Sequence, residues 1–227
     1  RGEDLHSTCA ELVYGEKWND QAEPDCEYIK SKSKCRCKGH KKLRTHIKTV
    51  NFGLAYGMGA NKLADTVGID KKDAEQLIKD YFEAFPNIGA FLDKLGNFGT
   101  TFGYIKTFPP YNRRRWFSNW FPKMYNSREN SQEFSSIERA SKNTPIQGAS
   151  ADMTKKALIL MRNYIKEFNM PVKLVMTVHD QIDTICKDEY VGAWIIKMKE
   201  LMEEAANEIV TNKLLKAEVT VSDCWEK

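Results

Sequence analysis

Two cations and two aromatic residues recur at every fourth position of the segment RTHIKTVNFGLAYG, namely Arg44, Lys48, Phe52 and Tyr56. Each step of four residues advances about 400° around a helix, so such a stripe drifts only about 40° per step. In a helix the four side chains therefore share one side. Cations suit a polyphosphate, and flat aromatic rings suit a base or a sugar. The ordinary alternative is a solvated basic turn followed by aromatic residues that face the core.

The sequence VHDQ places a carboxylate, Asp180, between two β-rich runs at residues 172–178 and 182–186. These runs predict a hairpin with Asp180 at its turn. A rigidly held carboxylate there can face a cleft, and it suits a Mg²⁺ ion that substrate phosphates also bind. The ordinary alternative is that Asp is common in turns. Asp183 lies three residues on, and an odd separation along a strand points it to the opposite face, so we do not assign it to the metal.

Three cysteines and a histidine occur close together in the polar, lysine-rich segment 19–42, NDQAEPDCEYIKSKSKCRCKGHKK. The spacing C-x8-C-x-C-x2-H brings Cys26, Cys35, Cys37 and His40 within reach of one Zn²⁺ ion. This is not the spacing of a standard zinc finger, so loop cysteines without a metal are the alternative. The composition of the segment predicts an insertion or loop between two helical stretches.

Hydrophobic periodicity predicts helices over most of the chain and strands in a few short runs. The segment 70–85 is the clearest helix, with Asp70 as N-cap, an apolar face and a proline just beyond its end. Further helices are predicted at 44–56, at 87–98, at 136–168 with a break near Pro145, and at 190–210. Strands are predicted at 104–108, 172–178, 182–186 and 217–221, and the aromatic, arginine-rich stretch that ends at residue 125 is predicted to be a loop. Helices followed by a small antiparallel sheet predict an α+β architecture.

The composition excludes several classes of protein. Of the 227 residues, 41% are hydrophobic and 29% are charged, which excludes wholesale disorder, a collagen-like fibre and a multispan membrane protein. Lys and Arg outnumber Asp and Glu by 35 to 31, a mildly basic balance that is compatible with a polyanion-binding face. No apolar run reaches the roughly 20 residues that span a bilayer, and the first residues lack the apolar core of a signal peptide. Six cysteines are too few for a disulfide scaffold, so we expect reduced thiols or metal ligands in an intracellular protein, in a bacterial or phage-infected cytoplasm.

Three segments resemble motifs of family A DNA polymerases, the class of bacterial DNA polymerase I. KTVNFGLAYGMG is similar to motif B, a Lys-x-x-x-Phe-Gly-x-x-Tyr-Gly helix of the fingers, and VHDQ is similar to motif C, usually Val-His-Asp-Glu. Between them, RASKNTPIQGASADM resembles the family's helix that carries Arg, Asn and Gln ahead of motif C. The connecting segments YFEAFPNI and GYIKTFPPYNRRRW also match, in the same order and spacing. The resemblance covers nearly the whole chain except residues 19–42.

The resemblance implies that the stripe on the fingers helix binds the incoming nucleotide. Arg44 and Lys48 would hold its triphosphate, and Lys48 would also protonate the departing pyrophosphate. Phe52 would pack against the sugar and base, and Tyr56 would lie on the template side of the nascent pair. His6, in the Asp-Leu-His match near the start of the chain, corresponds to another nucleotide-contacting position.

Other matched positions imply contacts with primer–template DNA. One set would contact the duplex where uncharged donors can read minor-groove acceptors that every base pair presents: Arg139, Asn143, Gln147 and His179. A second set, flanked by aromatic residues, suits contacts with phosphates: Arg113, Arg114 and Arg115. A solvated loop is the alternative for this arginine run.

The resemblance also implies two catalytic Mg²⁺ ions, which Asp180 would coordinate together with a second carboxylate from motif A. Motif A lies upstream of the Asp-Leu-His match in the family. We therefore expect the chain to be a C-terminal polymerase portion that is inactive alone and needs an upstream fragment with the other Asp, as in a phage-type split polymerase. Gln181 replaces the usual Glu, and we expect this change to tune the site rather than to abolish activity.

The expected fold is α+β, with a helical fingers subdomain and part of a palm that contains a small antiparallel sheet. Residues 1–18 would begin the fingers helices, 19–42 would be the insertion, 43–125 the fingers, and 126–227 the C-terminal palm portion with the catalytic hairpin. The expected partners are primer–template DNA, dNTPs and the N-terminal fragment, without a membrane. One alternative function is a non-catalytic nucleic-acid-binding module that keeps the fold but has no need of the full set of site residues. Another is a single-subunit phage-type RNA polymerase, against which Phe52-Gly53 and Gln147 argue by resemblance.

Overall fold

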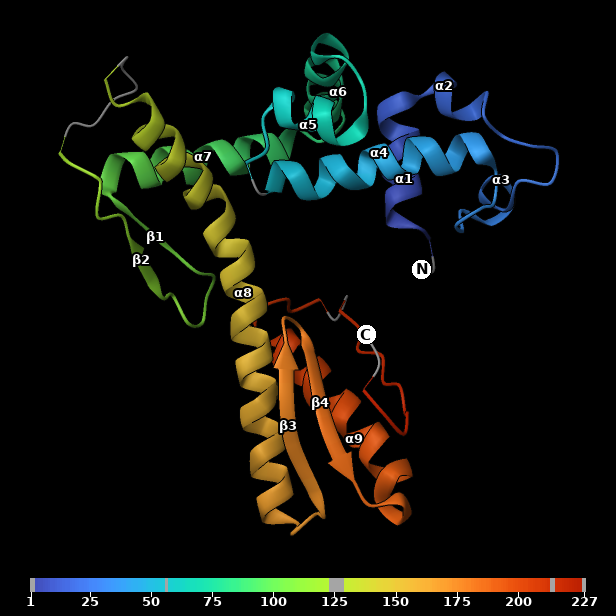
Figure 1. Cartoon of the computed structure of the whole chain (residues 1–227), viewed down its shortest axis with the longest axis vertical. Coiled ribbons are helices and arrows are strands. Elements are labelled where there is room, and N and C mark those ends of the chain that lie inside the picture. Colours follow the sequence, from blue (N-terminus) through green and yellow to red (C-terminus); the bar gives the residue numbers. More distant parts are fainter. Residues whose placement is uncertain (1–2, 56, 123–128, 213–214, 226–227) are drawn as a thin grey trace. The chain divides into compact units, whose positions relative to one another are not determined.

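The computed structural model describes residues 3–55, 57–122, 129–212 and 215–225. Most of this part of the chain is helical, and its short strands form two separate two-stranded sheets (Figure 1). This arrangement confirms the α+β fold class. None of the helices in the described ranges is both long and apolar enough to cross a bilayer.

The elements are α1 (Leu5–Tyr14), α2 (Glu16–Asn19), α3 (Glu27–Ser31), α4 (Lys38–Ala55), α5 (Ala60–Val67), α6 (Lys71–Ala84), α7 (Pro86–Phe102), β1 (Tyr104–Lys106), β2 (Arg114–Trp116), α8 (Ser131–Glu167), β3 (Val172–Val178), β4 (Gln181–Cys186) and α9 (Asp188–Asn207).

The chain divides into two units, residues 1–105 with 116–143, and residues 106–115 with 144–227. In the first unit α1 packs on α4 and α6, and α5 packs on α4 and α6 (Figure 1). These helices enclose a core whose fully buried side chains include Trp18, Ile47 and Val50. The core keeps α4, which carries the predicted stripe, fixed on its neighbours.

Helix α6 shows how local sequence sets the ends of an element. Asp70 accepts a hydrogen bond from the backbone N–H of Asp73 at 2.8 Å, as an N-cap residue does. Ala74 and Leu77 are buried on the inner face. The next helix begins at Pro86, where the missing N–H of proline costs no hydrogen bond. The helix predicted at 70–85 is therefore confirmed.

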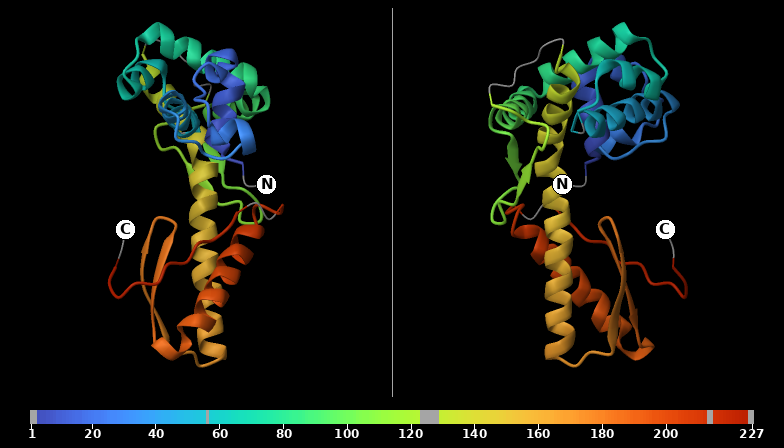
Figure 2. Two further views of the ribbon diagram at one scale, coloured as in Figure 1. Left: turned by 90° about the vertical axis from the view of Figure 1, so that its right-hand side faces the viewer. Right: turned by 60° about the vertical axis from the view of Figure 1, so that its left-hand side comes forward.

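The second unit is built around an antiparallel hairpin. β3 and β4 pair from end to end, and Val178 is opposite Gln181 beside the turn. In both views of Figure 2 the hairpin and α9 lie alongside the C-terminal half of α8. Met161 of α8 and Trp194 of α9 are buried together in the core that these elements share. The predicted hairpin is confirmed, and the core supports its inner face.

The break predicted near Pro145 is wrong, because α8 is continuous through this residue. A proline inside a helix removes one hydrogen bond and costs about 3 kcal/mol. Pro145 is fully buried, so the packing of its ring offsets part of that cost.

Three other predictions differ from the structure. Residues 217–221 form no strand, because the backbone N–H of Ala217 donates to Glu203 of α9 at 3.3 Å and Val219 packs against the core without a ladder. The segment 19–42 is not only a loop, since it contains α3 and the start of α4. The strand predicted at 104–108 ends at Lys106, and it pairs with β2, which lies in the stretch predicted to be a loop.

Candidate functional site

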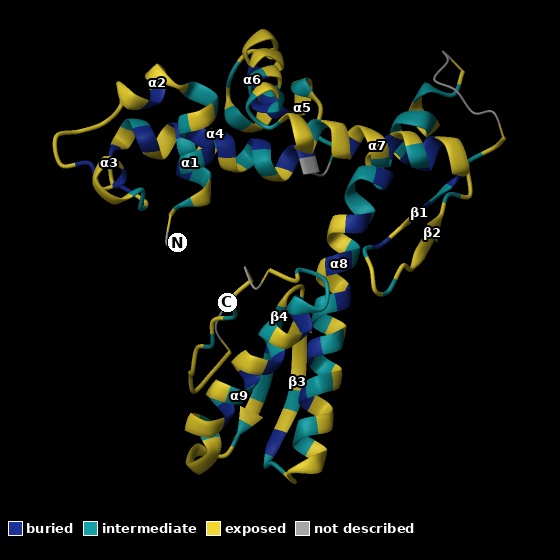
Figure 3. Cartoon of the chain, turned by 180° about the vertical axis from the view of Figure 1, so that it is seen from behind, coloured by how far each residue is buried: buried dark blue, intermediate teal, exposed yellow. Residues whose placement is uncertain are grey.

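Helix α4 exposes the middle of the predicted stripe. Lys48 is exposed and Phe52 is 48% exposed, whereas Ile47 and Val50 elsewhere on the helix are fully buried. Figure 3 shows this change from buried to exposed positions around α4. The alternative in which the aromatic residues face the core therefore does not hold for Phe52. Tyr56, the last residue of the stripe, lies outside the described residues.

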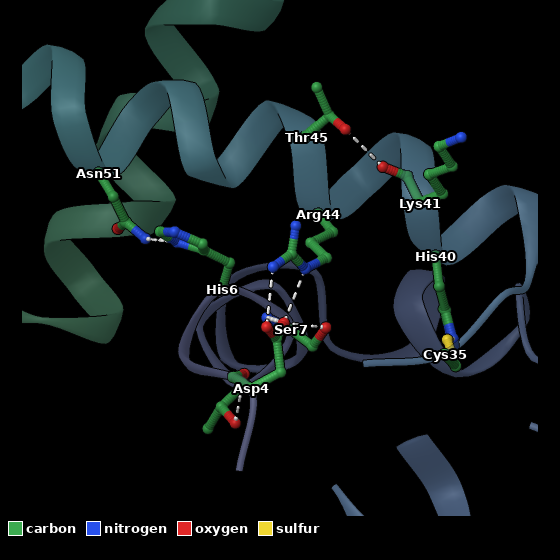
Figure 4. A network of polar contacts seen from close by, with 10 residues as sticks. Asp4, His6, Ser7, Cys35, His40, Lys41, Arg44, Thr45 and Asn51 are labelled. Carbon is green, nitrogen blue, oxygen red and sulfur yellow. Dashed lines mark hydrogen bonds and ion pairs between the residues drawn. The ribbon is translucent and has the colours of Figure 1, made fainter. Parts of the chain in front are cut away.

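Arg44 is bound by a carboxylate, Asp4, for which the sequence predicted no role in the site. Asp4, the N-cap of α1, accepts hydrogen bonds from Nε of Arg44 at 2.7 Å and from its Nη2 at 2.8 Å (Figure 4). It also accepts the backbone N–H of Ser7 at 2.9 Å. The hydrogen bonds from Arg44 outweigh the effect of burial and hold the pKa of Asp4 well below its usual range. A guanidinium has five N–H donors, so Arg44 keeps three for another acceptor such as a phosphate. The sequence signal for Asp4 is its position directly before the apolar residue Leu5 at a helix start, which is typical of an N-cap.

We expect Asp4→Asn to lower the free energy of unfolding by about 2–3 kcal/mol at neutral pH, because both partners of the ion pair are largely buried. The pKa of Asp4 is depressed in the folded state. Its stabilisation is therefore fully present well above the unfolded-state value of about 3.9 and is lost as the pH falls toward the depressed value. The difference between variant and wild type, measured by urea denaturation, should shrink from about pH 5 downward.

Asp25→Asn is the control for this measurement, because Asp25 forms an exposed ion pair with Lys30 at 3.1 Å. Exposed pairs contribute little to stability, so this variant should unfold almost as wild type does. Equal effects of the two substitutions would contradict the assigned role of Asp4.

His6 lies against Phe52 of the stripe. Nδ2 of Asn51 donates to Nδ1 of His6 at 3.0 Å (Figure 4), and the ring centroids of His6 and Phe52 are 5.7 Å apart. Partial burial and the positive charge of Arg44 lower the pKa of His6, which favours the neutral form of its ring. The structure therefore brings together two of the residues that the resemblance implies for nucleotide contact.

The four candidate zinc ligands also lie in the first unit. The three Sγ atoms and a ring nitrogen of the histidine all lie within 4.8 Å of one another. Cys26 precedes α3 directly, and His40 lies in the first turn of α4. The loop between these helices supplies the other two ligands, Cys35 and Cys37. The fold thus gathers side chains that are up to 14 residues apart in the sequence.

In the second unit, Asp180 lies in the two-residue turn of the β3–β4 hairpin. The preceding residue, His179, has a positive φ of 56°, which closes this tight turn. Both side chains are exposed, and Asp180 makes no hydrogen bond or ion pair with any other described residue. The turn therefore positions the backbone of Asp180, and its carboxylate is available to a ligand.

Strand β4 places a second carboxylate near the turn. Nε2 of Gln181 donates to Oδ1 of Asp183 at 2.7 Å, so these two side chains share one face of the strand. Side chains alternate between the two faces of β4 only from Gln181 onward, and Asp180 lies in the turn before this strand. The alternation along a strand therefore does not determine how Asp180 and Asp183 lie relative to one another. The other oxygen of Asp183, Oδ2, is buried without a hydrogen-bond partner among the described residues. The glutamine that replaces the usual glutamate thus binds a neighbouring carboxylate.

Three residues of α8 for which the resemblance implies contacts with DNA lie at intervals of four along the helix: Arg139, Asn143 and Gln147. Arg139 and Gln147 are exposed. Oδ1 of Asn143 is buried and has no hydrogen-bond partner within the described ranges. Because a buried unpaired acceptor is costly, a donor from outside the chain would stabilise this amide.

The arginine run has internal partners that the sequence did not reveal. Nε of Arg113 donates to Oδ1 of Asp152 on α8 at 2.7 Å, and the Asp152 side chain is only 4% exposed. Arg113 therefore neutralises a buried charge, although about half of its own side chain is exposed. Arg114 and Arg115 lie on β2 and are exposed, and Nη1 of Arg115 donates to Thr144 at 3.0 Å. The contacts of these arginines with DNA stay predictions.

Comparisons with known proteins agree with these motifs. The model of DNA polymerase family A matches residues 1–227. A thermostable DNA polymerase I from Thermus filiformis is 34% identical over 164 residues, which are 72% of this chain and 18% of that protein. DNA polymerase I of Chloroflexus aurantiacus is 30% identical over 187 residues, 82% of this chain and 19% of the relative.

A solved structure has a similar fold. It is the POL domain of Pol1 from M. smegmatis in complex with DNA primer-template and dNTP, with a TM-score of 0.70 and 27% identity. The match covers 90% of this chain and 31% of that one. This chain thus spans less than a fifth of the length of the two curated relatives. Because the family model matches its whole length, the chain belongs to DNA polymerase family A.

Proposed function

We propose that this chain is the C-terminal fingers and palm portion of a template-directed DNA polymerase that transfers a nucleotidyl group from a dNTP to a primer 3′-OH. In this proposal residues 43–125 belong to the fingers and residues 126–227 to the palm. The observation that carries it is the exposed stripe of α4, in which Lys48 and Phe52 face outward beside His6. The solved M. smegmatis domain, whose complex contains primer-template and dNTP, supports the same substrates.

The residues of the first unit have distinct roles in nucleotide binding. Lys48 and the remaining N–H donors of Arg44 bind the triphosphate, with Arg44 oriented by its two hydrogen bonds to Asp4. Phe52 and His6 present adjoining rings to the sugar and base. Lys48 also donates a proton to the departing pyrophosphate.

In the second unit, Asp180 supplies a hard oxygen ligand of the kind that Mg²⁺ prefers. The fit is good, because the carboxylate is exposed at a tight turn and makes no hydrogen bond or ion pair with any other described residue. When bound, Mg²⁺ stabilises the charge that develops on the attacking and leaving oxygens. Two such ions need a second carboxylate, which we assign to an upstream fragment with motif A.

The hairpin itself supports an upstream partner. A two-stranded sheet is at best marginally stable alone. Val175, Met176 and Ile185 are 57%, 39% and 63% exposed, so the hairpin keeps apolar surface uncovered. A further palm strand from the upstream fragment would cover such a surface and carry the second carboxylate to Asp180.

Primer extension tests the proposal directly. Residues 1–227 alone should not extend a primer, and extension should appear when the upstream polypeptide with motif A is added. The added polypeptide should also raise the melting temperature of this chain, because it covers the hairpin. Efficient extension by the chain alone, free of host polymerase, would contradict the dependence on a fragment. Binding of primer–template without extension in the complete mixture would favour the alternative, a non-catalytic binding module.

We expect Phe52→Tyr to increase incorporation of dideoxynucleotides relative to dNTPs in the complete polymerase. Phe52 is about half exposed and lies beside His6, where the resemblance places the sugar. A tyrosine hydroxyl there could replace the 3′-OH that a dideoxynucleotide lacks in the local hydrogen-bond network. The ratio of kcat/KM values for ddNTP and dNTP measures the effect. A control is Phe91→Tyr on α7, which should leave this ratio unchanged. Normal activity with an unchanged ratio in Phe52→Tyr would show that Phe52 does not contact the sugar.

A further inference from the structure

The segment 19–42, which the sequence predicts to be an insertion, contains three cysteines and a histidine whose ligand atoms lie nearly as close together as those around a bound ion. Nδ1 of His40 lies 3.1 Å from Sγ of Cys35 and 3.4 Å from Sγ of Cys26. The fourth ligand atom is Sγ of Cys37, and all four ligand atoms lie within 4.8 Å of one another. Zinc bonds of about 2.3 Å to sulfur and about 2.0 Å to nitrogen hold tetrahedral ligand atoms roughly 3.5–3.8 Å apart. Only small shifts of the side chains would complete a tetrahedron.

The histidine of this cluster is already in the form that binds a metal. Nε2 of His40 lies 2.8 Å from the backbone carbonyl oxygen of Trp18, so this nitrogen carries the proton and donates it. In this tautomer of the neutral imidazole, Nδ1 carries no proton and directs its lone pair at the thiols. The Trp18 ring stacks on His40 with centroids 3.8 Å apart and an interplanar angle of 9°, which fixes the orientation of the imidazole. Metal-ligating histidines usually have such an outer hydrogen bond.

Burial makes a metal a better explanation than thiols alone. Cys26 and Cys37 are 3% exposed, Cys35 is 9% exposed and His40 is 1% exposed. Thiols are weak hydrogen-bond donors, so gathering three of them around one ring nitrogen gives little stability. Three thiols also cannot all pair as disulfides, and all are free in the structure. Soft sulfur ligands with one imidazole are a donor set that zinc prefers.

We propose that Cys26, Cys35, Cys37 and His40 bind one structural Zn²⁺ ion, which anchors the insertion to α4. Four protein ligands fill a tetrahedral site and leave no open position, which is typical of structural rather than catalytic zinc. The metal joins the start of α3, the following loop and the first turn of α4.

The anchored segment also contacts the start of the chain. The carbonyl oxygen of Lys32 accepts the backbone N–H of Asp4 at 3.0 Å, and Nζ of Lys32 forms an ion pair with Glu11 at 2.7 Å. The hydroxyl of Tyr28 donates to the same glutamate at 2.8 Å. Zinc therefore orders a segment that supports helix α1 as well as its own loop.

The test begins with the wild-type, untagged chain purified without chelators. We expect about one equivalent of zinc per chain by inductively coupled plasma mass spectrometry. The X-ray absorption spectrum should show three sulfur ligands at about 2.3 Å and one nitrogen ligand at about 2.0 Å. Substitution with Co²⁺ should produce thiolate-to-metal charge-transfer absorption and strong tetrahedral d–d bands. Metal-free protein that also fails to bind added Zn²⁺ or Co²⁺ would overturn the proposal, as would a shell dominated by oxygen.

Variants connect the metal to these residues. Cys35→Ser and Cys37→Ser should each lose most of the zinc, whereas Cys224→Ser, which removes an exposed cysteine outside the cluster, should retain it. Removal of zinc from the wild-type chain should accelerate tryptic cleavage after Lys30 and Lys32 in the insertion at least about tenfold, with cleavage after Lys166 in α8 unchanged. Full zinc content in both cluster variants would overturn the assignment of ligands. An unchanged rate of cleavage without zinc would overturn the anchoring role.

Discussion

Asp180→Asn should abolish primer extension by the complete polymerase, with a fall in kcat of about 10³-fold or more. The asparagine keeps the size of the side chain but loses the charge that holds the metal. Asp180 is exposed in a hairpin turn and makes no bond to any other described residue, so its replacement removes no stabilising contact from the fold. The melting temperature and the affinity for the upstream fragment should therefore stay close to those of wild type.

Single-turnover extension with saturating dNTP measures this loss without a contribution from product release. Asp183→Asn is the most informative comparison, because Asp183 is the other carboxylate near the turn and accepts a hydrogen bond from Gln181. We expect that variant to retain most of its activity. A large loss of activity in Asp183→Asn together with normal activity in Asp180→Asn would show that Asp183, and not Asp180, binds the metal. Asp188→Asn, at the exposed start of α9, controls for the removal of one negative charge.

Local signals predicted the regular elements of this chain well. The helix at 70–85 followed from a capping residue, a periodic apolar face and a proline, all of which act within a few residues. The hairpin followed from two β-rich runs around a short turn. Pro145 shows the limit of such signals, because its burial in the fold overrides its local tendency to end a helix. The strand predicted at 217–221 is absent because the backbone N–H of Ala217 donates to a side chain of α9 instead of to a neighbouring strand.

The candidate site was predicted as a set of residue types but not as a set of contacts. The spacing of the stripe predicted that its side chains share one side of α4 but left open whether the aromatic residues face the core, and the spacing of the cysteines and the histidine indicated their cluster. The partners that fix these groups were not predicted, because they lie far away in the sequence. Asp4 is 40 residues from Arg44, and Asp152 is 39 residues from Arg113. Trp18, which orients His40, looks like any core tryptophan in the sequence. Such pairs become visible only when the fold brings them together.

Lys48→Met should lower kcat/KM for dNTP incorporation by about 10²–10³-fold. Lys48 is exposed on the same side of α4 as Phe52, and its side chain makes no hydrogen bond or ion pair with another described residue. Its ammonium group is thus not needed to hold the fold, and the variant should unfold at nearly the same temperature. Lys42→Met is the matched control, because Lys42 is also exposed on α4 but lies about 120° around the helix from Lys48.

Lys48→Arg separates the two roles proposed for this residue. Arginine retains the positive charge that binds the triphosphate, but its pKa above about 12 makes it a poor proton donor to the departing pyrophosphate. If Lys48 acts both as cation and as acid, Lys48→Arg should restore KM for dNTP close to the wild-type value while kcat stays low. Wild-type values of both kcat and KM in Lys48→Arg would show that Lys48 contributes only its positive charge. Wild-type kinetics in Lys48→Met would show that Lys48 of α4 does not contact the nucleotide.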